Sequence, residues 1–423
     1  MRCRRREALN RSIRQEGRDL KLFRNHSGAG PDRLLLWLFR RRIQIFIGLE
    51  TLAVVFLLAA YITGPARPAS RTGILSGRPS PLSGQENDPA EPEKADFIKW
   101  VDFDVTCDAM TQAFRFDVAT CQQEIHLNWV QLLAVLGARY GGDFSKYRPS
   151  DMEQLAERLQ NGETIEAVSK DLKYYPYYLE AYGAVLNGMV GYYEIQIPES
   201  EAPAFALAQN QDSAAGQEDS SLTPSGERKI WVTKYGLKAF HPLAKNFPYS
   251  HYNDFGVSRS YGYRRQHLGH DMMGQTGTPV IAVESGYVEA IGWNQYGGWR
   301  LGIRSFDKKR YYYYAHLRKD YPYQSELKEG SIVTAGDVIG YLGRTGYSAT
   351  ENTNNIDEPH LHFGLQLIFD ESQKEGNNEI WIDCYELVKF LSVNRSESVK
   401  AEGTKEWRRI YQMKDPAVAQ ESR

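Results

Sequence analysis

Five histidines and one aspartate in the second half of the chain fall into three short patterns that could bind a metal ion. The patterns are HLGHD at 267–271, YAHL at 314–317 and PHLHFG at 359–364. Alternate side chains of an extended strand share a face, so His267 and Asp271 would point into the same space across Gly269. The run that begins at His360 alternates polar and apolar residues, which predicts a strand with His360 and His362 on its open face.

These residue types predict hydrolytic metal chemistry. Two neutral imidazoles and one carboxylate leave one position of a tetrahedral zinc ion free, which is typical of catalytic zinc sites. Further histidines beside such a site could orient water, accept its proton and stabilise a developing oxyanion. Strand alternation would place His316 on one face with Tyr312 and Tyr314. The chain has no CxxC pair, so a thiolate zinc site is not expected.

The three motifs, in this order, resemble the signatures of the M23 family of zinc metallopeptidases, the lysostaphin- and LytM-like peptidoglycan hydrolases. The resemblance covers roughly residues 230–393. It implies zinc binding by His267, Asp271 and His362, and catalytic roles for His316 and His360, without deciding which of the last two is the base.

The chain departs from the family pattern at His270, where an aliphatic residue is usual. Strand parity places His270 opposite His267 and Asp271, which predicts a packed or hydrogen-bonded histidine rather than a ligand.

The resemblance predicts a zinc-dependent endopeptidase that hydrolyses peptide bonds in bacterial peptidoglycan at the outer face of the cell membrane. The alternative is a catalytically weak or inactive LytM-fold scaffold that binds cell wall or partner proteins, although no metal residue is missing. A D-Ala-D-Ala carboxypeptidase is disfavoured, because those enzymes place more residues between their first His and Asp than the three found here.

The composition agrees with a folded, exported enzyme. The 423 residues are 42% hydrophobic and 12% aromatic, which excludes a disordered or collagenous chain. The formal net charge of -2 hides an asymmetry, because residues 1–42 contain 13 Lys or Arg and only 4 Asp or Glu. Residues 43–62 contain no Lys, Arg, Asp or Pro and are long enough for a membrane-spanning helix.

Arg40, Arg41 and Arg42 border this apolar run, so the N-terminus is expected to be cytoplasmic and everything after the helix extracytoplasmic. A retained anchor is favoured over a cleaved signal peptide, because an unusually long basic segment precedes the run. The arm has little aromatic interleaving, so no nucleic-acid partner is expected. The expected partners are peptidoglycan peptide, the cell membrane through one transmembrane helix, and a protein partner of the helical domain.

The predicted fold class is α+β: a transmembrane helix, a small all-α domain and an antiparallel β-sheet LytM-like domain. Three patterns predict the helical domain. Ile125, Trp129 and Leu136 would share one helix face, and Ser150 with Glu153 would form a capping box at the start of a second helix. A third helix is rich in tyrosines, which are expected to pack in the core. Cys107 and Cys121 could pair only if a turn separated them. The predicted segments are a basic arm (1–42), an anchor (43–63), a flexible linker (64–94), the helical domain (95–200), an acidic flexible linker (201–227), the peptidase domain (228–393) and a charged tail (394–423).

Overall fold

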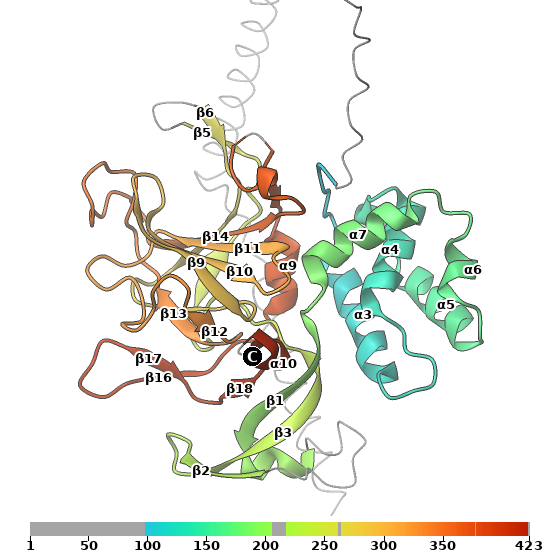
Figure 1. Cartoon of the computed structure of the whole chain (residues 1–423), viewed down its shortest axis with the longest axis horizontal. Helices are drawn as coiled ribbons and strands as arrows, with labels where there is room; N and C mark the ends of the chain where they lie inside the picture. Colours follow the sequence, from blue (N-terminus) through green and yellow to red (C-terminus); the bar gives the residue numbers. More distant parts are fainter. Residues whose placement is uncertain (1–97, 205–216, 261–263, 377, 422–423) are drawn as a thin grey trace, which may run out of the picture. The chain divides into compact units, whose positions relative to one another are not determined.

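The computed structural model describes residues 98–204, 217–260, 264–376 and 378–421 (Figure 1). The predicted basic arm, anchor and first linker lie outside these ranges. Among the helices of the described ranges, none has both the length and the apolar character needed to span a bilayer. The described residues belong to one compact unit, Glu91–Arg423.

A helical region comes first. Its helices are α3 (Cys107–Thr120), α4 (Trp129–Tyr140), η1 (Phe144–Lys146), α5 (Pro149–Gln160), α6 (Ile165–Ser169) and α7 (Tyr175–Leu186). Helix α4 begins at Trp129 because Asn128 caps it, its side chain accepting from the backbone N–H groups of Val130 and Gln131. Trp129 and Leu136 are buried as predicted, whereas Ile125 precedes the helix and is 38% exposed.

Two local predictions for the helical region have different outcomes. The predicted capping box is wrong, because α5 begins at Pro149 and its N-cap residue makes no side-chain capping bond. Proline at the first helical turn needs no N–H partner, so it can start the helix without a capping serine. The tyrosines of α7 belong to the core as predicted, with Tyr182 fully buried. Helix α3 runs continuously from Cys107 to Thr120, and Cys107 and Cys121 are both free thiols.

An antiparallel sheet follows, as predicted, with strand order β12-β9-β10-β11-β14-β7-β4 and β15 paired to β14. Its strands are β4 (Tyr249–His251), β7 (His270–Gly274), β9 (Gly286–Asn294), β10 (Gly298–Ser305), β11 (Arg310–Ala315), β12 (Ile332–Val333), β14 (His360–Leu367) and β15 (Ile380–Ile382). The Gly297-Gly298 signal marks the β9–β10 hairpin, since β10 begins at Gly298 and pairs with β9 from there. One face of the sheet packs into the core through Tyr312, Phe363 and Leu365.

The remaining helices and strands complete the fold. They are β1 (Val190–Pro198), η2 (Glu199–Glu201), β2 (Gln217–Leu222), β3 (Arg228–Leu237), β5 (Ser258–Ser260), β6 (Arg264–Gln266), β8 (Pro279–Ile281), β13 (Val338–Tyr341), η3 (Glu371–Gln373), α9 (Tyr385–Leu391), β16 (Ser398–Lys400), β17 (Trp407–Arg409), β18 (Met413–Lys414) and α10 (Pro416–Glu421). A second sheet has the order β18-β1-β3-β2.

Two strands of this second sheet lie in segments expected to contain no strands. Strand β2 lies in the range predicted as the acidic linker, and β18 lies in the predicted tail. Both are short strands that pair with long neighbours, and segments of two and six residues are too short and too polar to show a detectable apolar alternation.

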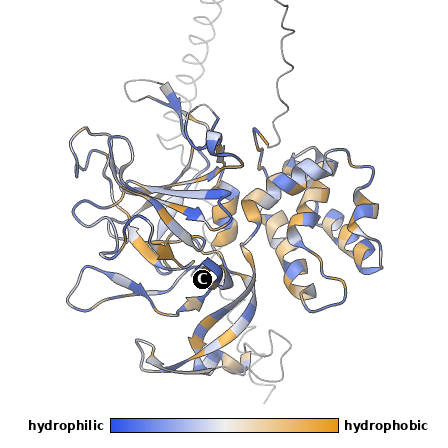
Figure 2. Ribbon diagram, viewed as in Figure 1, coloured by the Kyte–Doolittle hydropathy of each residue, from blue (hydrophilic) through white to orange (hydrophobic). Residues whose placement is uncertain are grey.

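The helical region and the sheet share packing contacts. Phe114 and Trp129 pack against Phe390 of α9, with ring centroids 5.8 and 5.6 Å from that of Phe390. Arg310 at the start of β11 donates from Nη1 to the carbonyl of Ala184 in α7, at 2.9 Å. Figure 2 shows hydrophobic residues concentrated on α4, α7 and α9. These contacts attach the helical region to the sheet that contains the histidine motifs.

Candidate metal centre

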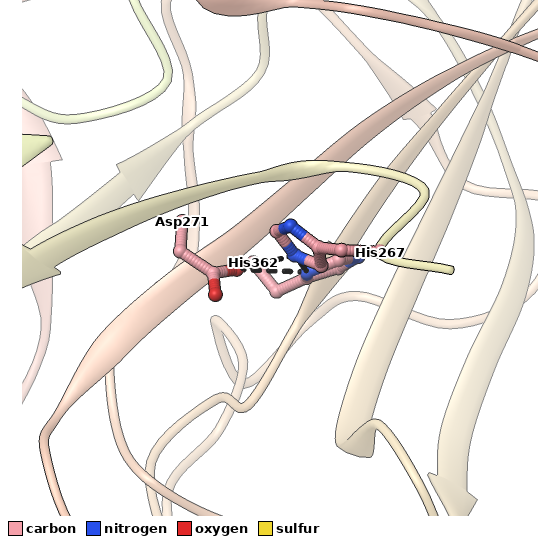
Figure 3. Close-up of side chains that lie close together, drawn as sticks. All are labelled: His267, Asp271 and His362. Carbon is pink, nitrogen blue, oxygen red and sulfur yellow. Dashed lines mark hydrogen bonds and ion pairs between the residues drawn. The ribbon is translucent and has the colours of Figure 1, made fainter. Parts of the chain in front are cut away.

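Three side chains from separate parts of the chain converge beside β14. Strands β7 and β14 pair so that Asp271 lies directly opposite His362, and His267 belongs to the connection before β7. The Nε2 atom of His267 lies 3.1 Å from Asp271 Oδ1 and 3.0 Å from His362 Nδ1. The Nδ1 atom of His362 lies 2.9 Å from the same Asp271 oxygen (Figure 3). The structure therefore brings the three predicted metal residues together.

The route by which His267 reaches the cluster differs from the predicted continuous strand. Strand β7 begins only at His270, and the chain bends at Gly269. A Cβ atom at Gly269 would lie 2.5 Å from both Cε1 and Nε2 of His362. Glycine is therefore required here because it leaves room for the imidazole of His362.

The hydrogen-bond pattern of His267 tests whether the cluster suits a metal ion. Its Nδ1 lies 3.2 Å from the backbone oxygen of Asp254, which can only accept, so Nδ1 carries the proton. With Nδ1 protonated, Nε2 is the ring atom whose lone pair can bind a metal ion, and it lies 3.1 Å from Asp271 Oδ1. A single cation could therefore bind both atoms. The separations of 2.9–3.1 Å are close to the roughly 3.4 Å between ligand atoms of a tetrahedral zinc ion. The donor set fits zinc.

The carboxylate is held in its charged form. Burial acts to raise the pKa of Asp271, but the contacts with His267 and His362 outweigh burial and hold this pKa well below its usual range. The second carboxylate oxygen lies 2.9 Å from Nη2 of Arg259. Asp271 is therefore an anion at neutral pH, as a metal ligand must be.

Two further histidines face the cluster. The ring centroids of His316 and His360 are 4.8 Å apart, and His316 lies 5.8 Å from His362. The Nδ1 atom of His316 donates to the carbonyl of Thr345 at 2.9 Å, and Nδ1 of His360 donates to that of Glu358 at 2.8 Å. Because these oxygens only accept, both rings keep Nε2 unprotonated when neutral.

Burial, reinforced by His360 and His362, lowers the pKa of His316 well below its usual value. His316 is therefore neutral at pH 7 and able to accept a proton. The Nε2 atom of His360 lies 3.8 Å from Asp271 Oδ2, beside the metal residues.

The face predicted for His316 is wrong. Strict alternation would have buried it with Tyr312 and Tyr314, which are indeed in the core. Strand β11 ends at Ala315, and His316 has φ +61°, which breaks the alternation and turns its ring towards His360. A left-handed residue other than glycine is uncommon, and it occurs here at a candidate catalytic position.

His270 has the role predicted for it. It is 2% exposed, and its Nε2 lies 2.8 Å from Nδ1 of His251 on β4. It therefore points away from the metal residues and joins β7 to its neighbour.

Sequence reasoning missed the residues that orient the site. Asp254 holds His267, Thr345 holds His316, and Arg259 contacts Asp271. Two of these contacts use backbone carbonyls, which every residue possesses, so residue type gave no signal. All three partners become neighbours only through the tertiary fold.

Comparison with known proteins finds a family match over this part of the chain. Residues 265–376 match the sequence model of Peptidase family M23. This segment contains all five predicted site residues. Over 130 residues the chain is 40% identical to the L-Ala–D-Glu endopeptidase of Bacillus subtilis (strain 168), a match covering 31% of this chain and 38% of that protein. Over 98 residues it is 39% identical to lysostaphin of Staphylococcus simulans, covering 23% of this chain and 17% of that protein.

Among solved structures, the catalytic domain of lysostaphin from Staphylococcus simulans is 31% identical, with a TM-score of 0.26. That match covers 33% of this chain and 92% of the lysostaphin domain. The chain thus spans well under half the length of these curated relatives.

Proposed function

We propose that this chain is a zinc-dependent endopeptidase that hydrolyses peptide bonds in bacterial peptidoglycan. The observation that carries the proposal is the convergence of His267 Nε2, Asp271 Oδ1 and His362 Nδ1 within 3.1 Å of one another. Residues 265–376, which match Peptidase family M23, contain all three, and the partial similarity to the endopeptidase of Bacillus subtilis and to lysostaphin supports the same reaction class here.

The proposed mechanism divides the work between two sets of residues. His267, Asp271 and His362 would hold zinc, which when bound supplies Lewis-acid polarisation of the scissile carbonyl and of water. His316 and His360, each fixed through Nδ1 by a backbone carbonyl, present Nε2 lone pairs to the reacting groups. One accepts the proton of the attacking water, and the other, once protonated, donates a hydrogen bond to the oxyanion.

We also propose that the enzyme works outside the cell membrane, close to the lipid surface. The proposal depends on the basic arm and on the apolar run at 43–62, which predict an anchor with a cytoplasmic N-terminus. A tether of this kind would restrict hydrolysis to the wall nearest the membrane. Protease protection in inverted and right-side-out vesicles would test this orientation.

The test of the activity is muropeptide analysis by mass spectrometry after digestion of purified wall with the full chain. New peptide termini should appear with the wild type and should be absent with His267→Ala and His360→Ala. Activity at the wild-type level in both variants would contradict the site assignment, and no new termini with the zinc-loaded wild type would contradict the proposed function.

A further inference from the structure

A groove of about 750 Å³ opens beside the metal residues, over the face of the sheet that does not enter the core. His267, His316 and His362 line one end of it. Its charged lining residues are Arg265, Arg300, Lys374, Glu289, Glu375 and Glu379. A peptide bound for hydrolysis at the metal residues must lie along this groove, so these charges meet the substrate.

Three of these charged groups, Lys374, Glu289 and Glu379, already have partners. Lys374 contacts Glu289, which also lies 3.4 Å from Nη1 of Arg304. The Oε2 atom of Glu379 accepts from the indole N–H of Trp381 at 2.7 Å. These groups are therefore less available to a ligand.

Arg300 differs from these groups. Among the described residues it makes no side-chain hydrogen bond or ion pair, and its Nε is buried without a hydrogen-bond partner. Arg300 as a whole is only partly buried, so the rest of its guanidinium is open to a ligand, and a bound carboxylate would supply the anionic partner that the described residues do not. Arg265, which also makes no ion pair among the described residues and also has a buried Nε without a hydrogen-bond partner, differs in that its guanidinium lies over the ring of Tyr347 at 4.9 Å.

The sheet register places Arg300 close to the metal residues. Leu301 pairs with Tyr314, and Ala315 pairs with His362. Arg300, Ala315 and His362 therefore occupy one row across β10, β11 and β14. Two strand spacings separate the Cα atoms of Arg300 and His362 by about 10 Å. Ala315 and Tyr313 of β11 line the groove between them.

The carboxylate of Glu379 lies towards the other end of the groove. Glu379 precedes Ile380, which pairs with Leu367, five residues beyond His362 along β14. That separation corresponds to about 17 Å of strand. The groove is therefore positive where the scissile bond would lie and acidic farther away.

We propose that Arg300 binds a carboxylate carried by the substrate residue adjacent to the scissile bond, so that the groove selects acidic peptides over neutral ones. This inference rests on the proposed endopeptidase function. The planar guanidinium can bind a carboxylate through two parallel hydrogen bonds, a geometry that a carboxamide cannot satisfy. In peptidoglycan, Arg300 would favour stem-peptide bonds next to a free carboxylate and disfavour uncharged bridges such as Gly-Gly.

The test uses the zinc-loaded full chain and two fluorescently labelled stem peptides that contain an L-Ala–D-Glu bond. The peptides are identical except that the α-carboxylate of D-Glu is free in one and converted to a carboxamide in the other. Equilibrium binding is measured by fluorescence anisotropy, and cleavage is measured separately as kcat/KM. The wild type should prefer the carboxylate peptide by about tenfold or more in both measurements.

Arg300→Gln should reduce the preference to near one by weakening only the carboxylate peptide, mainly through KM. Arg300→Lys, which keeps the charge, should retain part of the preference and provides the comparison if the glutamine variant folds poorly. Arg228→Gln is the matched control, because it removes an exposed arginine that pairs with Glu199 and does not line the groove, and it should leave the preference unchanged.

Equal binding of both peptides by the wild type, or binding of neither, would overturn the role of Arg300. So would an Arg300→Gln variant that keeps the preference or weakens both peptides equally. A wild type that binds the carboxylate peptide preferentially but cleaves neither would instead contradict the proposed function and leave the role of Arg300 standing.

Discussion

Replacing Gly269 with alanine should damage the metal centre without unfolding the sheet. The added Cβ would lie 2.5 Å from Cε1 and Nε2 of His362 and 3.0 Å from the backbone oxygen of Phe363. Ordinary contact between carbon atoms needs about 3.5 Å, so the imidazole must retreat by about 1 Å. Its Nδ1, now 2.9 Å from Asp271 Oδ1, would leave the position it shares with the other ligands.

A displacement of this size should weaken zinc binding by roughly 10- to 100-fold, about 1.4–2.7 kcal/mol. Zinc affinity can be measured on the full chain by competition with a chromophoric chelator, while circular dichroism checks the fold. Gly191→Ala is the matched control, because its new Cβ would meet only the Cδ atom of Lys238, at 3.9 Å. A folded Gly269→Ala variant with wild-type zinc affinity would refute the steric reasoning.

Three further predictions concern catalysis and stability. His360→Ala should keep zinc affinity within about twofold but lower kcat by about 10²- to 10⁴-fold, and a loss of zinc binding would make His360 a ligand instead. Glu284→Ala leaves the buried guanidinium of Arg310, now bonded at 2.7 and 2.9 Å, without its main partner. Glu284→Ala should therefore lower the free energy of unfolding in urea by about 3–5 kcal/mol. Glu199→Ala, which breaks an exposed ion pair, should lower the same free energy by less than about 1 kcal/mol. Burial lowers the pKa of His241 to about 3, so the unfolded chain binds more protons below pH 6.5 and stability should fall as the pH drops from 7 to 5. His241→Asn should remove roughly 2 kcal/mol of that fall; an unchanged pH dependence would show that His241 is protonated in the folded chain.

The sequence predicted the β14 part of the site well because strand alternation is a strictly local property. From His360 to Leu367, polar and apolar residues alternate, and Leu361 and Leu365 are buried as that pattern requires. Similar parity reasoning assigned His270 to the opposite face from the metal residues, where it contacts His251.

Parity failed where the backbone leaves the extended region. Gly269 bends the chain before β7, and His316 adopts φ +61° directly after β11. Glycine occurs in many backbone conformations, and histidine rarely adopts a positive φ. The φ angle at neither position can therefore be predicted from the residue type. The proposed role of Arg300 could not be predicted from the sequence either. It depends on Arg300 lying in one row with His362 across three strands, which only the folded sheet brings about.

The most direct test of the central claim is the dependence of wall-peptide hydrolysis on bound zinc. The full chain is stripped with a chelator and titrated with Zn²⁺ while muropeptide release is followed. The site formed by His267, Asp271 and His362 predicts no hydrolysis before titration, a linear rise to one equivalent of zinc per chain, and no rise in His362→Ala. Hydrolysis by the stripped chain, or full activity in His362→Ala, would contradict the account.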